Sequence, residues 1–250
     1  MEQPGHGRVV PLVRGSATGN GADATATRTR EPALEPAPAP EPWTLAPSAS
    51  SRAKRALDVV VTAAVAPLAF VLIAVLAVLV VATSRGPVFF VQERVGRGGR
   101  RFRMVKFRTM VVDAEARLRQ DPTLWAEYVT NHYKLPATTD PRVTRVGRFL
   151  RRSSLDELPQ LLNVLRGDMS LVGPRPVVPD ELAMYGDHPE VYLGVKPGVT
   201  GWWQVNGRSG VGYPTRVDLD KAYAESWTLW LDIKILLRTP LTVLQARGAH

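Results

Sequence analysis

The stretch from Val59 to Thr83 is almost entirely apolar and contains no charged residue. Roughly 20 consecutive apolar residues suffice to cross a lipid bilayer, and this stretch has about 25. A buried helix of a soluble domain is the alternative interpretation, but the length of the run favours a membrane segment. We therefore expect a membrane-embedded helix over about residues 57–83.

Pro67 lies inside this apolar run. Proline removes a backbone donor and clashes with the preceding helical turn, so it predicts a kink. Positive flanks tend to stay on the cytoplasmic side of a membrane, and here both flanks are positive. The sequence thus suggests a re-entrant helix that enters the membrane, bends at Pro67 and returns to the same face. The flanking cations are Arg52, Lys54 and Arg55 before the run, and Arg85, Arg94 and Arg97 after it.

The composition allows one folded domain with an appendage. The chain has 250 residues, of which 45% are hydrophobic, and its formal net charge is +9. Such a charge favours nucleic acid, acidic lipid headgroups or phosphorylated substrates as partners, without choosing among them. Cysteine is absent, which excludes disulfides and thiolate metal sites.

Residues 1–50 differ in composition from the rest of the chain. They are rich in Ala, Pro, Gly and Thr and contain few large apolar side chains. Such a segment cannot form a packed core. We expect a disordered tail over residues 1–50 and a folded domain over residues 51–250.

Turn and strand signals after the apolar run predict a β-hairpin. Gly86-Pro87 marks a turn, and Val88–Val91 has the composition of a short strand. Gly96–Gly99 predicts a tight turn, and Phe102–Phe107 is expected to be the returning strand. The single Arg-Gly-Gly sequence in this hairpin is weak evidence for RNA binding.

Two further segments each allow two interpretations. Asp58 follows Arg55 at the start of the apolar run, and we expect an intrahelical ion pair or a cap there rather than a catalytic group. The stretch Ser226–Thr239 predicts a helix on which Trp227, Trp230 and Leu231 share a face. Such a helix fits either the membrane interface or the protein core.

The stretch Asp140–Pro176 concentrates charged residues in a regular pattern. Ser154 and Glu157 have the spacing of a capping box, although a helix beginning at Asp156 places Pro159 better in the first turn. In either register the acidic pair lies at a helix N-terminus, and the alternative interpretation is that the pair only caps the helix. A basic face suited to phosphate precedes the pair, made of Arg142, Arg145, Arg148, Arg151 and Arg152.

Gly173–Pro176 holds Arg175 between two prolines, close in sequence to Asp168. An acidic pair, a basic face and a braced arginine together predict a site for a metal-bound diphosphate. Carboxylates can hold Mg²⁺, which neutralises phosphate charge and lets an anionic nucleophile approach. The sequence has neither a Gly-x-x-x-x-Gly-Lys phosphate loop nor a His-Glu-x-x-His metal motif.

The run SLDELPQLLNVLRGDMSLVGPRP, which ends at Pro176, resembles the signature of the bacterial sugar transferases. These are monotopic phosphoglycosyl transferases that prime glycan assembly on undecaprenyl phosphate. The resemblance extends from about Arg52 to near the C-terminus, although Ala66 stands where relatives often carry a serine. It is also carried by Lys54–Asp58, Val91–Met110, Lys196–Ser209 and Ser226–Thr239.

The resemblance implies a two-step reaction at the acidic pair. Asp156 would attack the β-phosphorus of a UDP-sugar and release UMP, and polyprenyl phosphate would then attack the phosphosugar on the carboxylate. Glu157 would position Mg²⁺ or the incoming phosphate, so both carboxylates are candidate Mg²⁺ ligands. Residues expected to bind substrate are Lys106, Arg108, Arg145, Arg152, Arg175, Gln204 and Asn206.

The fold expected is a mainly helical α+β domain, monotopic in the inner membrane through a re-entrant N-terminal helix and with its catalytic part in the cytoplasm. Hexose 1-phosphate, from glucose or galactose, is preferred over an acetamido sugar as the transferred group. The main rival from another class is a non-catalytic, membrane-tethered adaptor that binds acidic lipid. A nucleic-acid binder is disfavoured, because the arginines flank an acidic pair. The sequence leaves the oligomeric state open.

Overall fold

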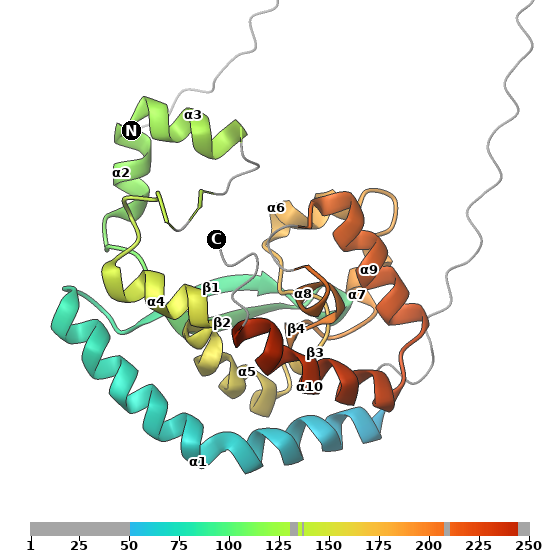
Figure 1. Cartoon of the computed structure of the whole chain (residues 1–250). Helices are drawn as coiled ribbons and strands as arrows, with labels where there is room; N and C mark the ends of the chain where they lie inside the picture. The colour runs from blue at the N-terminus through green and yellow to red at the C-terminus, as the bar shows by residue number, and fades with distance from the viewer. Residues whose placement is uncertain (1–50, 131–134, 137, 208–210, 245–250) are drawn as a thin grey trace, which may run out of the picture. The chain divides into compact units, whose positions relative to one another are not determined.

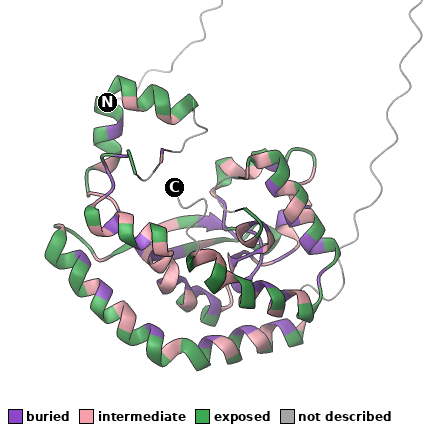
Figure 2. Ribbon diagram, in the orientation of Figure 1, coloured by how far each residue is buried: buried purple, intermediate pink, exposed green. Residues whose placement is uncertain are grey.

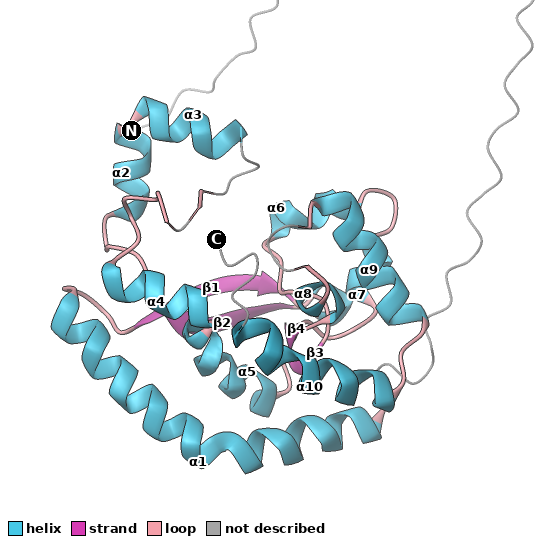
Figure 3. Ribbon diagram, viewed as in Figure 1, coloured by secondary structure: helices cyan, strands magenta, loops and turns pink. Residues whose placement is uncertain are grey.

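The computed structural model describes residues 51–130, 135–136, 138–207 and 211–244. The tail predicted over residues 1–50 lies outside them, as do Arg208 and Ser209 of the loop that follows Asn206. The described domain is mainly helical, as predicted, with two small sheets (Figures 1 and 3). Its α-helices are α1 (Arg52–Thr83), α2 (Ala114–Gln120), α3 (Pro122–Thr130), α4 (Arg145–Ser153), α5 (Leu161–Arg166), α6 (Pro179–Leu182), α7 (Pro189–Leu193), α8 (Trp202–Val205), α9 (Tyr213–Glu225) and α10 (Leu229–Leu244). The 3-10 helices are η1 (Arg97–Gly99), η2 (Leu155–Gln160) and η3 (Ala183–Tyr185), and the strands are β1 (Phe89–Val95), β2 (Arg101–Phe107), β3 (Ser170–Val172) and β4 (Gly198–Thr200).

The apolar run forms most of the single long helix α1. The Oγ of Ser51 caps the helix by accepting a hydrogen bond from the backbone N–H of Lys54, at 3.2 Å. Pro67 lies inside the helix, whose ribbon curves around the rest of the domain (Figure 1). Only 17% of its most apolar window is buried in the domain, and exposed residues run along its length (Figure 2). The helix is therefore long and apolar enough to cross a membrane, and the described residues of this chain leave most of its apolar surface uncovered.

The predicted hairpin is confirmed, with longer strands than expected. Strands β1 and β2 pair antiparallel, with Phe90 opposite Lys106 and Arg94 opposite Phe102. The turn between them contains Gly98 at a φ of 67°, a left-handed conformation that glycine adopts without a steric penalty. Because residues two apart on a strand share a face, Phe90 and Arg94 lie on the same face of the hairpin as Lys106.

Strands β3 and β4 form a short parallel pair that the sequence did not predict. Ser170 pairs with Gly198, and Val172 pairs with Thr200. A Cβ atom at Gly198 would lie 2.1 Å from the backbone nitrogen of Gly173, so the two segments can approach this closely only without a side chain there. The pairing brings the segment before Arg175 against the segment 196–201.

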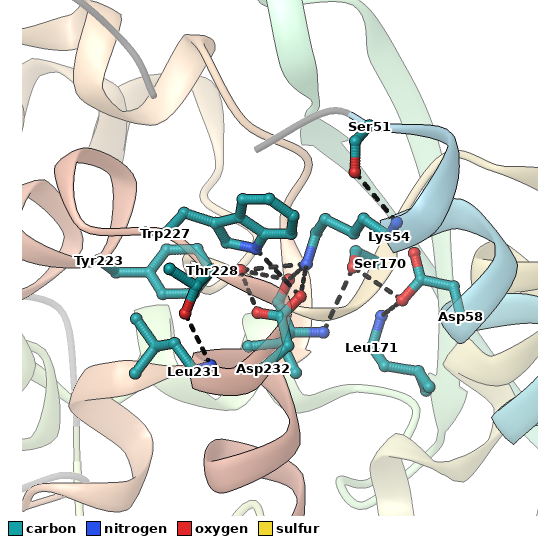
Figure 4. Close-up of polar contacts among 11 residues, drawn as sticks. Ser51, Lys54, Asp58, Ser170, Leu171, Tyr223, Trp227, Thr228, Leu231 and Asp232 are labelled. Atoms are coloured by element: carbon teal, nitrogen blue, oxygen red, sulfur yellow. Dashed lines mark hydrogen bonds and ion pairs between the residues drawn. The ribbon is translucent and has the colours of Figure 1, made fainter. Parts of the chain in front are cut away.

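A buried polar cluster joins the first turn of α1 to the C-terminal helix (Figure 4). The Nζ of Lys54 contacts an Oδ2 of Asp232 at 2.6 Å, and both side chains are almost fully buried. The same Nζ donates to the carbonyl of Val172 at 2.9 Å. Asp232 also accepts hydrogen bonds from the Tyr223 hydroxyl at 2.8 Å and from Trp227 Nε1 at 3.0 Å. This Lys54–Asp232 cluster links three segments that are far apart in the sequence.

Asp58 does not form the predicted ion pair with Arg55. Its carboxylate is buried and accepts hydrogen bonds from Ser170 Oγ and from the backbone N–H of Leu171, both at 2.9 Å (Figure 4). Arg55 donates instead to backbone carbonyls at the end of α5, including that of Leu165 at 2.7 Å. The prediction was wrong because tertiary partners compete successfully with a neighbour on the same helix.

The C-terminal helix also differs from the sequence-based expectation. Trp227 precedes α10 and is buried in the core, whereas Trp230 is exposed, with Lys234 Nζ lying 5.6 Å from its ring centroid. The two tryptophans therefore do not share one face. Trp227 serves the core, and Trp230 with Lys234 has the amphipathic character of an interfacial pair.

Candidate active site

The acidic pair lies in the first turn of the 3-10 helix η2, directly after α4. Ser154, between the two helices, has a φ of 55° and makes no side-chain capping bond, so the predicted capping box is wrong. The left-handed residue ends α4 and redirects the chain, and Pro159 is accommodated within the short helix. Asp156 is buried, with 8% of its surface exposed, whereas Glu157 is partly exposed.

A small pocket lies beside this pair. The face of the hairpin that carries Lys106 forms one wall, and the segment containing Arg175 forms another. Within the pocket, Arg175 approaches Glu157, with 3.4 Å between a guanidinium nitrogen and Oε1. The lining residues are Arg94, Met104, Lys106, Glu157, Gln160, Arg175, Pro176, Gly198 and Val199.

Burial and charge shift the pKa values of the two central groups in opposite directions. Burial raises the pKa of Asp156 to about 6, with a further rise from the neighbouring charge of Glu157. Lys106, Arg151 and Arg175 oppose that rise. Burial also lowers the pKa of Lys106 to about 8, with Arg175 adding to the decrease and Asp156 opposing it. A carboxyl group and an amino group thus lie in one poorly hydrated site, and the pKa of each is shifted towards neutral pH.

Two of the predicted substrate-binding residues, Lys106 and Arg175, come together with the acidic pair. Arg108 does not, because its guanidinium donates to the Ser84 carbonyl at 2.8 Å and to the carbonyl of Arg85 at the end of α1. These contacts place Arg108 outside the pocket lining, and its role in substrate binding stays a prediction. Its side chain holds the start of the hairpin against the helix.

The remaining predicted binding residues lie outside this pocket among the described residues. Arg145 and Arg152 are exposed on α4, and Gln204 lies on α8. Asn206, just after α8, donates from Nδ2 to the carbonyl of Trp202 at 2.7 Å. A role for these four residues in substrate binding stays a prediction.

The predicted basic face is divided by the fold. Arg142 precedes α4 and is held by Asp140 in a bidentate ion pair with both contacts at 2.9 Å. Arg151 donates from Nε to Thr109 Oγ1 at 2.9 Å, and its charge acts on Asp156. Helical spacing placed both arginines on one face, but only Arg151 belongs to the site.

Sequence reasoning missed Arg94 and Gln160 as pocket residues. Arg94 is buried on β1 and donates to the carbonyl of Pro176 at 3.0 Å and to Glu181 at 3.2 Å. It therefore braces the chain directly after Arg175. Strand alternation could have found it, since Arg94 lies an even number of residues from Phe90 on the same face.

The residues at the pocket fit Mg²⁺ only if substrate phosphate oxygens complete the set of ligands. Among the described residues, no group of three or more His, Cys, Asp or Glu side chains is placed to hold a metal ion. Mg²⁺ is commonly bound by one or two carboxylates together with substrate phosphates. Asp156 and Glu157 supply such a pair of carboxylates, and Lys106 and Arg175 add positive charge for a diphosphate.

The sequence model of the bacterial sugar transferases matches residues 49–246. This match covers the whole described domain, including the acidic pair and the pocket. The chain belongs to this family. The membership accounts for α1, the hairpin and the acidic pair as parts of one shared domain.

Three relatives illustrate the similarity. The undecaprenyl-phosphate galactose phosphotransferase of Salmonella typhimurium is 52% identical over 169 residues, which cover 66% of this chain and 35% of the relative. The UDP-galactose-lipid carrier transferase of Erwinia amylovora is 47% identical over 212 residues, covering 82% of this chain and 43% of the relative. The exopolysaccharide production protein ExoY of Sinorhizobium fredii is 42% identical over 205 residues, covering 79% and 88%. The chain therefore spans less than half of the first two relatives and most of the third.

Proposed function

We propose that this protein transfers a sugar 1-phosphate from a UDP-sugar to undecaprenyl phosphate, giving undecaprenyl-diphosphosugar and UMP. One observation carries the proposal: a buried carboxylate, Asp156, lies next to a pocket lined by Glu157, Lys106 and Arg175, and the charges of all three act on it. Anionic donor and anionic acceptor must both approach such a site, and its positive charge favours them. The names of the Salmonella and Erwinia relatives support the same reaction class.

The reaction proceeds in two displacements at one phosphorus atom. A carboxylate oxygen of Asp156 attacks the β-phosphorus of the UDP-sugar, and the bond from that phosphorus to the bridging oxygen breaks. UMP leaves with the electron pair of the broken bond, and the sugar phosphate stays on Asp156 as an acyl phosphate. A phosphate oxygen of the polyprenyl phosphate then attacks the same phosphorus and releases the Asp156 carboxylate.

The cations of the pocket stabilise the charge that develops in both displacements. Arg175 is held by its flanking prolines, and the carbonyl of Pro176 is fixed by Arg94. Lys106 projects from β2 as a point charge beside Asp156. Glu157 and Asp156 would hold Mg²⁺ together with the diphosphate, and this ion would neutralise phosphate charge when bound.

The transferred sugar is proposed to be a hexose, with galactose or glucose as the first donors to test. Two relatives are named for galactose, which supports a hexose over an acetamido sugar. We further propose that α1 is a re-entrant helix hinged at Pro67, which places the pocket at the cytoplasmic face of the inner membrane. UDP-sugars are cytoplasmic and the acceptor phosphate lies at the bilayer surface, so the two substrates meet there.

The deciding experiment measures UMP release by detergent-extracted protein supplied with Mg²⁺, undecaprenyl phosphate and each of several UDP-sugars. Wild type is compared with Asp156→Asn, and with Asp180→Asn as a control acidic residue on α6 that does not line the pocket. We expect wild type to release UMP with one hexose donor. Asp156→Asn should lose this release, and Asp180→Asn should keep it. Release that survives in Asp156→Asn would exclude this nucleophile. No release with any donor would favour the membrane-tethered adaptor.

A further inference from the structure

The backbone on both sides of Arg175 is fixed, whereas its side chain is loosely held. Before Arg175, the carbonyl of Pro174 accepts a hydrogen bond from the N–H of Gly198 at 2.7 Å. The Arg175 side chain is 49% exposed, and its guanidinium lies 3.4 Å from Glu157, a long distance for an ion pair. The backbone therefore sets where Arg175 stands, and the guanidinium is able to leave Glu157 for a phosphate.

The segment after Arg175, residues 176–178, is hydrogen-bonded at every backbone donor and acceptor. Its partners come from the end of β1, from α6 and from α7. The carbonyl of Pro176 accepts from Arg94 and that of Val177 from the N–H of Val95, both at 3.0 Å, and the N–H of Val178 donates to Glu181 at 3.2 Å while its carbonyl accepts from the N–H of Glu181 at 3.0 Å. The remaining N–H, that of Val177, donates to the hydroxyl of Tyr192 at 3.2 Å. Such complete pairing holds the segment in one conformation.

The hydroxyl of Tyr192 bridges this segment and the hairpin. It accepts from Val177 N–H and donates to the carbonyl of Val95, the last residue of β1. Only one direct hydrogen bond, from Val95 N–H to the Val177 carbonyl, joins the same two residues. Burial raises the pKa of Tyr192, so its hydroxyl keeps the proton that it donates. The contact between Val95 and Val177 thus depends on this hydroxyl.

Glu181 fixes the same segment at two further points. Its Oε2 accepts from the N–H of Val178 and from a guanidinium nitrogen of Arg94, both at 3.2 Å. The same nitrogen of Arg94 donates to the carbonyl of Pro176. One carboxylate oxygen therefore holds residue 178 directly and residue 176 through Arg94.

The hairpin that receives these contacts also carries Lys106, on β2. We infer that Tyr192 and Glu181 are positioning residues of the proposed reaction, which hold segment 176–178 on the hairpin so that Arg175 and Lys106 meet one diphosphate together. Neither residue lines the pocket, so both act through Arg175. The inference rests on the proposed function, which makes a diphosphate the ligand of the two cations.

The alternative is that both residues serve stability alone, and the chain offers a matched control for each. Tyr185 lies in the same core cluster as Tyr192, with 5.4 Å between the ring centroids, but its hydroxyl donates to Asp220 on α9 at 2.8 Å. Tyr185→Phe therefore removes a buried hydroxyl that does not touch the segment. Asp180 is the exposed neighbour of Glu181 on α6, and Asp180→Asn removes a carboxylate of the same helix.

The test measures kcat/KM for a radiolabelled UDP-hexose in the presence of undecaprenyl phosphate, with wild-type Arg175 and with Arg175→Gln. With Arg175 present, Tyr192→Phe and Glu181→Gln should each lower kcat/KM by about tenfold, because the guanidinium is displaced from the diphosphate. Tyr185→Phe and Asp180→Asn should stay close to the wild-type value. In the Arg175→Gln protein, Tyr192→Phe and Glu181→Gln should cause no further decrease, because the group that they position is absent.

The outcomes separate a positioning role from a structural one. Partial unfolding lowers kcat/KM by the same factor with and without Arg175, so an equal decrease in both proteins would overturn the inference. Kinetics like those of wild type in Tyr192→Phe and Glu181→Gln would also overturn it, as would an equal decrease in Tyr185→Phe. Should Tyr192→Phe fail to fold, Glu181→Gln decides the question, because it loosens the same segment. If wild type releases no UMP with any donor, the proposed function itself fails and the inference fails with it.

Discussion

At the scale of single residues, the ionisation of two groups limits the pH range in which the site should be active. In the proposed reaction Asp156 must be a carboxylate to attack phosphorus, and burial raises its pKa to about 6. Lys106 must be charged to stabilise the phosphate oxygens, and burial lowers its pKa to about 8. Both requirements are met together only between these two values. The two groups also interact, so the limits that kinetics reports belong to the pair.

The acid limit is tested by the pH dependence of UMP release in a single turnover. Below pH about 6 the carboxylate of Asp156 takes up a proton, so the rate should fall roughly tenfold for each pH unit further down. Glu157→Gln removes the second-largest cause of the raised pKa, and the acid limit should then move to lower pH. An acid limit that stays in place in this variant would show that another group controls it.

The alkaline limit is tested with Lys106→Arg. The rate in wild type should fall above pH about 8, as Lys106 loses its charge. Arginine remains protonated at any pH that the protein tolerates, so the variant should keep its rate to higher pH, even if its maximum is lower. The same alkaline decline in both proteins would assign the limit to a different group.

The residues at the centre of the site were the most predictable. The acidic pair and Arg175 stand in an unusual local sequence, and Lys106 lies in a segment that resembles the family. Arg94 was not identified as a pocket residue because its role depends on a contact made across the fold, to the carbonyl of Pro176. The contact of Arg108 with the Ser84 carbonyl likewise could not be read from the local sequence.

At the scale of elements, local signals predicted the hairpin and α1 but not how they dock. Glycines at the turns and apolar residues between them predict the bounds of β1 and β2 to within a few residues of the observed ones. The parallel pair β3–β4 has three residues in each strand and no local turn to join them, so no local pattern indicates it. The contact between Lys54 and Asp232 spans 178 positions and could not be read from either segment alone.

Loss of one member of the Lys54–Asp232 cluster should strongly lower the stability of the domain, because it leaves a buried charge uncompensated. Lys54→Met leaves the buried Asp232 charge without its cationic partner, and such a loss costs about 3–5 kcal/mol in free energy of unfolding. The double variant Lys54→Met with Asp232→Asn removes the unpaired charge. It keeps a side-chain oxygen for the hydroxyl of Tyr223, so it should recover most of the loss. Thermal unfolding in detergent measures both.

A suitable comparison for that measurement is the exposed ion pair between Arg101 and Glu93 on the hairpin. Arg101→Met removes the same type of contact where water screens it, and it should change the stability by less than about 1 kcal/mol. Equal effects of Lys54→Met and Arg101→Met would mean that the buried cluster does not hold α1 to the domain.

At the scale of the whole molecule, α1 carries an extended apolar surface of the described domain. Its exposed apolar side chains lie along the helix on both sides of Pro67, while its first turn is fixed by the Lys54–Asp232 cluster and its last turn by Arg108 (Figure 2). Both ends of the helix are thus bound to the same folded domain. A helix held at both ends by one domain is difficult to reconcile with a straight crossing of the bilayer.

The last prediction concerns the topology of α1. Because the chain has no cysteine, single cysteines placed at Ser51 and at Ser84 report the side of the membrane without interference. Both residues flank α1, and in the re-entrant topology both should react with a membrane-impermeant maleimide only after the inner membrane is opened. Labelling of Ser84→Cys in intact spheroplasts would show that α1 crosses the bilayer.

Replacing Pro67 with leucine should favour this crossing, since an unbroken apolar helix of this length can span the hydrocarbon core. If Pro67→Leu leaves both cysteines protected, the contacts of Lys54 and Arg108 with the domain hold the two ends together, and proline is not the hinge that determines the topology.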